Sequence, residues 1–259
     1  MMRALVTGGG KRLGRAMALF LAHRGYDVAV HYSASKTEAD DVVAMVVATG
    51  RQAVAVQADL LVDAQTETLI ARAAAGLGGP LHVLVNNASI FEYDTLQTAT
   101  RRSWDRHMQS NLRAPFILMQ GFAAQVPVAV PDAAGEPSAQ GLVVNMIDQR
   151  IEKLTPEFMS YTLAKMGLWA LTQTAAQALA PHVRVNAIGP GPTLQGARQT
   201  AEHFAKQRAA TILGRGANPS DVTAALGFFL DVPSVTGQFI AVDGGQRLAW
   251  QTPDVLGVE

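Results

Sequence analysis

The chain contains 259 residues, 49% of them hydrophobic, which is enough to bury the single large core of an α/β domain. Its 21 basic and 21 acidic residues cancel, so the sequence lacks the charge signature of a protein that binds nucleic acid or an anionic membrane. Cysteine is absent, which excludes disulfides, thiolate catalysis and cysteine metal sites, and we predict no metal site. We expect neither a signal peptide nor a membrane span, and therefore a soluble cytoplasmic protein.

Short β-rich runs alternate with longer helical patterns along the chain. The runs that predict strands are 4–7, 28–31, 53–57, 83–85, 142–146, 183–187 and 239–242. The patterns that predict helices are 13–24, 36–49, 64–77, 100–125, 156–180 and 220–230. Strands that are apolar on both faces and joined by helices are typical of a parallel sheet covered on two sides. We therefore predict a doubly wound α/β fold, with the proline-rich segment 127–140 as a surface excursion.

A glycine-rich turn, TGGGKRLG, follows the first predicted strand and precedes the first predicted helix. Glycines let backbone N–H groups approach an anion, and a helix N-terminus favours negative charge, so this arrangement is typical of a pyrophosphate site. Gly8 and Gly10 fit the G-x-G-x-x-G spacing, whereas Leu13 stands where the third glycine belongs. A merely flexible turn is the alternative.

The end of the second predicted strand indicates which nicotinamide cofactor is bound. Folds specific for NAD place an Asp or Glu there to bind the ribose 2′-hydroxyl. This chain instead has the run 31–36, HYSASK, with no carboxylate before Glu38. Hydroxyls, a lysine and Arg12 from the glycine turn suit a 2′-phosphate, so NADP(H) is favoured over NAD. The alternative is that Lys36 and Glu38 only begin a solvated helix.

The predicted helix 156–180 carries Tyr161 and, four residues later, Lys165. This spacing puts both side chains on one helix face, one turn apart. A nearby ammonium favours the phenolate, so we expect the pKa of Tyr161 to lie below its reference of about 10 and to suit proton transfer. An ordinary helix surface is the alternative.

Taken together, these residues resemble the short-chain dehydrogenase/reductases over nearly the whole chain. The matches are the turn 7–14 (family pattern TGxxxGxG), Asp59, Asn86-Asn87-Ala88, Asn111, Tyr161-x-x-x-Lys165, Pro190-Gly191 and Asp243-Gly244-Gly245. Two positions depart from the family pattern: Arg12 replaces its middle loop glycine, and Asp148 stands thirteen residues before the tyrosine, where the catalytic serine is expected. The resemblance implies a single Rossmann-type domain over 1–259, with a mostly parallel seven-stranded sheet and helices on both faces.

Both departures, together with NNASIF in place of NNAG, look like the pteridine reductases and the related dihydromonapterin reductases. In that branch Arg12 would lie near the cofactor phosphates, and Phe91 would stack on a pterin ring held over the nicotinamide. Ser89 and Asp148 would also line the substrate pocket. An ionised carboxylate only accepts hydrogen bonds, so Asp148 suits the N–H groups of a pterin better than a simple ketone.

The resemblance also implies the roles of the remaining site residues. Tyr161 would donate the proton, Lys165 would hold the nicotinamide ribose, Asn111 would help a water chain to reach that lysine, and Asp148 completes the catalytic set. The expected cofactor-binding residues are Gly8, Arg12, Leu13, Gly14, His31, Tyr32, Ser33, Asp59, Asn87, Ala88, Ser89, Lys165, Pro190, Gly191 and Thr193. The expected substrate-binding residues are Phe91, Ser89, Asp148 and Tyr161.

The segment 192–214 is expected to form a substrate loop or lid. Family resemblance and the wide apolar surface of the helix after Pro156 favour a homotetramer acting on a small molecule. Three functions stay open: an NADPH-dependent reductase of a dihydropterin such as dihydrobiopterin, dihydromonapterin or dihydrofolate, a carbonyl reductase of substrates such as 3-oxoacyl thioesters, and a regulatory NADP-binding protein without turnover.

Overall fold

The computed structural model describes residues 1–196 and 198–252 and contains a seven-stranded parallel sheet. Its strands are β1 (Arg3–Val6), β2 (Asp27–Tyr32), β3 (Ala53–Gln57), β4 (Val83–Asn86), β7 (Gly141–Met146), β8 (Val183–Pro190) and β9 (Phe239–Val242). Their order across the sheet is β3-β2-β1-β4-β7-β8-β9. The central strands are buried on both faces because helices cover both sides, as the continuous apolar runs predict.

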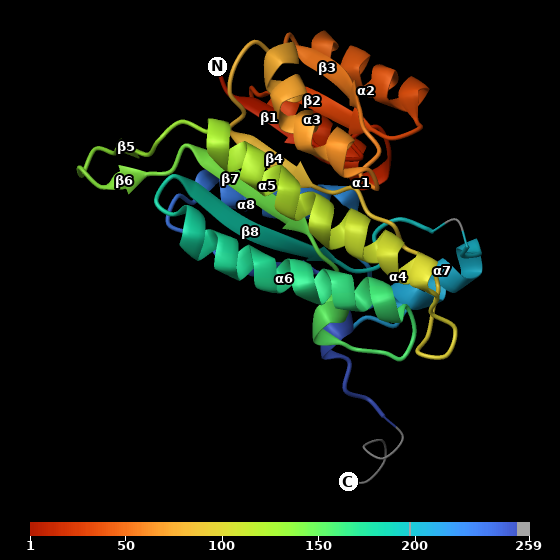
Figure 1. Ribbon diagram of the computed structural model, residues 1–259. Coiled ribbons are helices and arrows are strands. Elements are labelled where there is room, and N and C mark those ends of the chain that lie inside the picture. The colour runs from red at the N-terminus through yellow and green to blue at the C-terminus, as the bar shows by residue number, and fades with distance from the viewer. Residues whose placement is uncertain (197, 253–259) are drawn as a thin grey trace.

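Helices cover the two faces of the sheet in separate layers (Figure 1). The helices are α1 (Arg12–His23), α2 (Lys36–Ala48), α3 (Asp63–Gly76), α4 (Arg101–Met108), α5 (Ala114–Gln125), α6 (Met159–Leu179), α7 (Ala201–Ala209) and α8 (Pro219–Asp231). Helices α1, α2 and α8 contribute to one hydrophobic cluster, and α3, α5 and α6 contribute to another on the opposite face. The predicted doubly wound Rossmann-type fold is therefore confirmed.

The largest difference from the predicted elements lies in the segment 100–125, which was expected to be one helix. A π-helical turn, Gln109–Arg113, separates α4 from α5. Short π-helical turns are frequent at functional sites, and this one contains the buried Asn111. Helix α6 also begins three residues later than predicted, because Phe158 adopts a left-handed conformation with φ of 55°.

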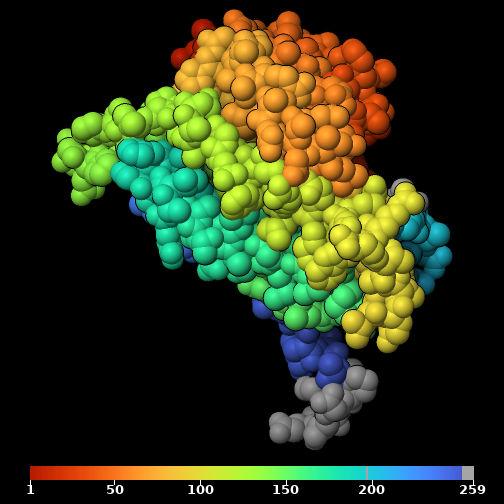
Figure 2. Space-filling model, in the orientation of Figure 1, coloured from red at the N-terminus to blue at the C-terminus, as the bar shows by residue number. Residues whose placement is uncertain are grey.

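The proline-rich segment 127–140 leaves the body of the molecule as a small antiparallel hairpin of β5 (Val130–Pro131) and β6 (Pro137–Ser138). Figures 1 and 2 show it projecting beyond the ends of α5 and α6, as expected for a surface excursion. Within residues 1–196 and 198–252, no helix combines the length and the apolarity needed to cross a bilayer.

The strand order reverses between β1 and β4, which lie side by side at the centre of the sheet. In open α/β sheets, ligands bind at such a switch point, beyond the carboxyl ends of the strands. The glycine turn follows β1, and Asn87 and Ala88 follow β4. The fold therefore brings these two sequence motifs together at one edge of the sheet.

Candidate active site

The glycine turn is fixed to the second strand through a buried histidine. Gly8 has φ of 61°, and its N–H donates to Nδ1 of His31 over 3.0 Å. The other ring nitrogen, Nε2, lies 3.0 Å from the carbonyl oxygen of Ala58 and must carry the ring proton. Burial lowers the pKa of His31 to about 4, so the imidazole is neutral and holds the turn against the end of β3.

Helix α1 begins directly against this turn. A Cβ atom on Gly14 would lie 2.1 Å from the carbonyl oxygen of Gly8 and 2.7 Å from Nδ2 of Asn87, so only glycine fits there. Lys11, the N-cap residue, makes no side-chain capping hydrogen bond. The first N–H groups of α1 are thus left for an anion, the arrangement that a pyrophosphate requires.

A cavity of about 640 Å³ opens at this helix N-terminus. Its lining includes most of the expected cofactor-binding residues: Gly8, Arg12, Leu13, Gly14, His31, Ser33, Asp59, Asn87, Ala88 and Ser89. Tyr32 instead packs against the hydrophobic cluster under α1 and α2, because neighbouring strand residues point to opposite faces. Lys36 pairs with Asp40 at 2.5 Å and is not among the lining residues. The lysine that does line the cavity is Lys11, which pairs with Glu38 at 2.6 Å.

Arg12 connects the glycine turn to the segment 192–214. Its guanidinium donates to the carbonyl oxygens of Gln195 at 2.7 Å and Leu194 at 3.0 Å. Arg12 also has φ of 51°, a conformation that is uncommon outside glycine. Its predicted contact with the cofactor phosphates stays a prediction, and the structure shows in addition that Arg12 holds the segment 192–214 through these two hydrogen bonds.

Asp148 and Tyr161 are joined by a hydrogen bond. The Tyr161 hydroxyl donates to Oδ2 of Asp148 over 2.9 Å, although the two residues stand thirteen positions apart. Oδ1 of the same carboxylate accepts the N–H of Arg150 over 2.9 Å and caps a 3₁₀ turn, Gln149–Glu152. The carboxylate therefore caps this turn and also contacts Tyr161, and its predicted part in catalysis stays a prediction.

The pKa shifts in this pair differ from the sequence expectation. Burial, reinforced by the Asp148 carboxylate, raises the pKa of Tyr161 well above 10. The prediction that this pKa is lowered is therefore wrong. Lys165 lies over the tyrosine ring, with Nζ 5.7 Å from the ring centroid, and Nζ donates to the carbonyl oxygen of Met146 over 2.7 Å. Burial also raises the pKa of Asp148 and lowers that of Lys165 to about 8. Tyr161 is consequently protonated at neutral pH and ready to donate.

An aromatic wall stands beside this tyrosine. The rings of Phe91 and Tyr161 meet edge to face with centroids 4.6 Å apart. Phe158 stacks on Phe91 at 4.3 Å and an interplanar angle of 13°. Arg198 lies over both phenylalanine rings, at 5.2 Å and 5.6 Å, and donates to the carbonyl oxygen of Phe91. Phe91 is 43% exposed, so part of a hydrophobic ring is accessible next to Tyr161.

Asn111 holds the chain segment that leads to Phe91. Its Oδ1 accepts the N–H of Ile90 at 2.9 Å and the hydroxyl of Ser89 at 3.2 Å, and its Nδ2 donates to the carbonyl oxygen of Ile90 at 2.8 Å. The structure thus shows Asn111 positioning residues 89 and 90. Its predicted part in a water chain to Lys165 stays a prediction.

The loop after β8 packs against Asp243 and is not among the residues that line the cavity. A Cβ atom on Gly191 would lie 2.7 Å from Asp243, which explains the glycine after Pro190. The buried Thr193 donates to the carbonyl oxygen of Gly191 at 3.1 Å. Its expected contact with the nicotinamide or the pyrophosphate stays a prediction. The segment 192–214, which was expected to form a substrate loop, contains α7, and residue 197 of that segment lies outside the described residues.

Sequence reasoning missed part of this site. The additional cavity-lining residues are Lys11, Leu60, Leu61, Ile90, Arg106 and Ser110. Lys11 belongs to the glycine turn and could have been found from its position there. Sequence reasoning also missed a buried cluster of Asp94, His107 and Ser160 beside Tyr161. The available signals were that Ser160 directly precedes Tyr161 and that His107 stands four residues before Asn111.

Comparison with known proteins defines the class. The family model described as short chain dehydrogenase matches residues 2–212, and this chain belongs to that family of oxidoreductases. An uncharacterized oxidoreductase of Methylorubrum extorquens is 33% identical over an alignment of 252 residues that covers 94% of this chain and 97% of that protein. The 3-oxoacyl-(acyl-carrier-protein) reductase FabG of Staphylococcus aureus is 32% identical and matches over 95% of this chain and 98% of its own length.

Solved structures include a more similar protein. FolM alternative dihydrofolate reductase 1 from Brucella canis, complexed with NADP, has a TM-score of 0.90 and 42% identity, over 98% of this chain and 97% of that chain. A short chain dehydrogenase from Burkholderia cenocepacia in complex with NADP has a TM-score of 0.84 and 31% identity, over 95% of this chain and 97% of its own.

Proposed function

We propose that this protein is an NADPH-dependent reductase of a dihydropterin, such as dihydrobiopterin, dihydromonapterin or dihydrofolate. The observation that carries the proposal is the carboxylate of Asp148, hydrogen-bonded to Tyr161 at the position of the family's serine, beside the exposed ring of Phe91. The similarity to a structure named as an alternative dihydrofolate reductase supports it.

The cavity fits NADP(H). The uncapped N-terminus of α1 and the tight Gly8–Gly14 contact suit the pyrophosphate, and Lys11 and Ser33 at the cavity wall suit a 2′-phosphate. Six of the similar solved structures contain NADP or NADPH. When bound, NADPH supplies the hydride that reduces the carbon of a C=N or C=O bond.

The protein supplies the proton and the orientation. Tyr161 is protonated at neutral pH and donates its hydroxyl proton to the atom at the other end of the reduced bond. Asp148 accepts hydrogen bonds, so it can pair with the amino and ring N–H groups that a pterin presents. The Phe91 ring stacks on Phe158 but is still 43% exposed, and an aromatic contact with it would stabilise a flat substrate by about 1 kcal/mol beyond simple burial.

A spectrophotometric assay of NADPH oxidation tests the proposal with dihydrobiopterin, dihydromonapterin, dihydrofolate and an acetoacetyl thioester. Turnover of a dihydropterin at a kcat/KM well above that of the thioester is the expected result. Phe91→Ala should then raise the KM for the dihydropterin several-fold more than for any ketone. Turnover of the thioester alone would contradict the proposal.

The alternative function is a 3-oxoacyl thioester reductase, and the similarity to the Staphylococcus aureus enzyme favours it. The Tyr161–Lys165 pair serves either reaction, since both need a proton donor beside the nicotinamide. The same assay separates them. The third possibility, a regulatory protein without turnover, does not fit an oxidoreductase family member whose tyrosine and lysine are both in place.

We also propose that the protein is a homotetramer and that residues 192–214 act as its substrate lid. Four large apolar side chains on α4, α5 and α6 are exposed: Trp104, Phe116, Leu163 and Met166. A second copy of the chain would bury them. Light scattering coupled to size-exclusion chromatography tests the assembly, and a monomer would overturn it. A cytoplasmic location stays a prediction from the sequence.

A further inference from the structure

The segment that carries Phe91 past the catalytic helix has alternating exposure. Phe91 and Tyr93 are exposed, Ile90 and Glu92 are partly buried, and Asp94 is buried. This alternation is that of an extended chain, in which successive side chains point to opposite sides. The inward residues Ile90, Glu92 and Asp94 are held by hydrogen bonds. The outward residues Phe91 and Tyr93 carry exposed aromatic rings.

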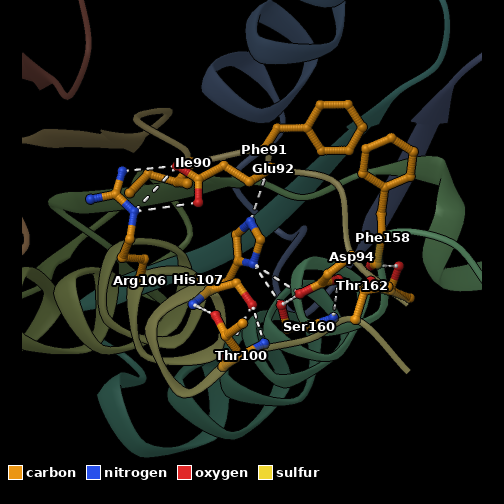
Figure 3. A network of polar contacts seen from close by, with 12 residues as sticks. Ile90, Phe91, Glu92, Asp94, Thr100, Arg106, His107, Phe158, Ser160 and Thr162 are labelled. Atoms are coloured by element: carbon orange, nitrogen blue, oxygen red, sulfur yellow. Dashed lines mark hydrogen bonds and ion pairs between the residues drawn. The ribbon is translucent and has the colours of Figure 1, made fainter. Parts of the chain in front are cut away.

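A directed chain of hydrogen bonds anchors the inward side (Figure 3). The Glu92 N–H donates to Nε2 of His107 over 3.1 Å. His107 must therefore carry its proton on Nδ1, which lies 2.6 Å from Oγ of Ser160, and the Ser160 hydroxyl donates to the Asp94 carboxylate. The direction is fixed at both ends, because a backbone N–H can only donate and a carboxylate can only accept.

The three side chains are almost fully buried: His107 is 0%, Ser160 0% and Asp94 1% exposed. Burial lowers the pKa of His107 and keeps the ring neutral, as the chain of hydrogen bonds requires. Burial alone would raise the pKa of Asp94, but the hydrogen bonds from Ser160 outweigh it and the pKa is lowered. A buried polar network with every link satisfied holds one conformation.

The same carboxyl group begins the catalytic helix. Phe158, the N-cap residue of α6, makes no side-chain capping bond, and Asp94 takes its place from a distant part of the chain. Oδ1 of Asp94 accepts the N–H of Ser160 over 3.1 Å, and the Asp94 carbonyl oxygen accepts the N–H of Met159 over 3.3 Å. Tyr161 directly follows Ser160. The cap fixes the first residues of α6 and thereby the position of Tyr161.

We propose that His107, Ser160 and Asp94 are positioning residues that fix the Phe91 ring relative to the Tyr161 hydroxyl. They thereby set the preference for a planar ring over an aliphatic carbonyl. The inference rests on the proposed function. The network lies close to both rings. The centroid of the His107 ring is 6.0 Å from that of Tyr161, and the Tyr161 centroid is 4.6 Å from that of Phe91. The three act on the substrate only through these two rings.

Two variants break the chain in different ways. Ser160→Ala removes its middle link, and Asp94→Asn keeps the shape but places an amide N–H where only an acceptor fits. Each should raise the KM for a dihydropterin about fivefold, while the KM for an acetoacetyl thioester changes less than twofold. Thr172→Ala is the matched control, since this buried hydroxyl on the same helix also makes two hydrogen bonds, with Leu168 and Asn145.

A double-mutant cycle tests whether the network acts through Phe91. In a Phe91→Ala background, Ser160→Ala should leave the dihydropterin KM almost unchanged, because the ring that it positions is gone. Three results would overturn the inference but not the proposed function. The first is an equal rise in KM for both substrates, and the second is an undiminished rise in KM in the Phe91→Ala background. The third is the same change in KM in Thr172→Ala, at a comparable loss of thermal stability. A natural protein that reduces ketones but no dihydropterin would overturn the proposed function, and the inference with it.

Discussion

Replacing Asp148 by serine restores the residue that most short-chain dehydrogenases are expected to carry and removes one carboxylate. In the structure this carboxylate caps the turn at Arg150 with one oxygen and accepts the Tyr161 hydroxyl with the other. Serine is itself a good capping residue, so the turn should survive. The substitution therefore removes chiefly the acceptor oxygen that contacts Tyr161 and that is proposed to contact the substrate.

The size of the effect follows from the unpaired groups. A buried donor left without an acceptor costs about 1–3 kcal/mol, which corresponds to roughly a fivefold to 150-fold fall in kcat/KM for a dihydropterin. The Asp148 carboxylate also contributes to raising the pKa of Tyr161 and counteracts the lowering in Lys165, so its removal should shift both pKa values downward. The alkaline limb of the pH–rate profile should accordingly move to lower pH.

The assay compares kcat/KM for a dihydropterin and an acetoacetyl thioester across pH in the natural protein and in Asp148→Ser. Asp148→Asn is the matched control for volume: it keeps the size of the side chain, loses the charge and turns an N–H toward Tyr161. It should lose dihydropterin turnover to a similar extent. Full dihydropterin turnover by Asp148→Ser would refute the role of the carboxylate and leave only the reductase class.

Three further predictions concern the cofactor and the proton donor. Tyr161→Phe should lower kcat about a hundredfold with NADPH affinity nearly unchanged, because only the proton donor is lost; retention of most activity would place the donor elsewhere. The NADPH affinity should weaken as pH rises through about 8, because the buried Lys165 loses its proton there. In a fluorescence titration, Lys165→Ala should bind NADPH more weakly than the natural protein and should lack this pH dependence. NADPH should be used at least about tenfold better than NADH, and Arg12→Ala should narrow that ratio; equal use of both by the natural protein would contradict the prediction.

The sequence determined the fold because its signals are local and consistent. Continuous apolar runs separated by helical patterns require a parallel sheet with both faces covered, and the strands 53–57 and 239–242 were predicted with their observed bounds. The helix break at 109–113 was not predictable, since a π-helical turn has no local sequence signal and is stabilised here by what Asn111 contacts. The left-handed Phe158 is a similar case, because no propensity favours that conformation.

The sequence also named the principal site residues, because Tyr161, Lys165 and Asp148 stand in a fixed register on adjoining elements. It could not give their protonation. One helix turn between Tyr161 and Lys165 suggested a lowered tyrosine pKa, but the tertiary structure buries the phenol and places a carboxylate on it, and these two effects raise the pKa instead. Only the folded chain brings Asp94 and His107 to the start of α6, since contacts between distant segments depend on packing and leave no periodic trace in the sequence.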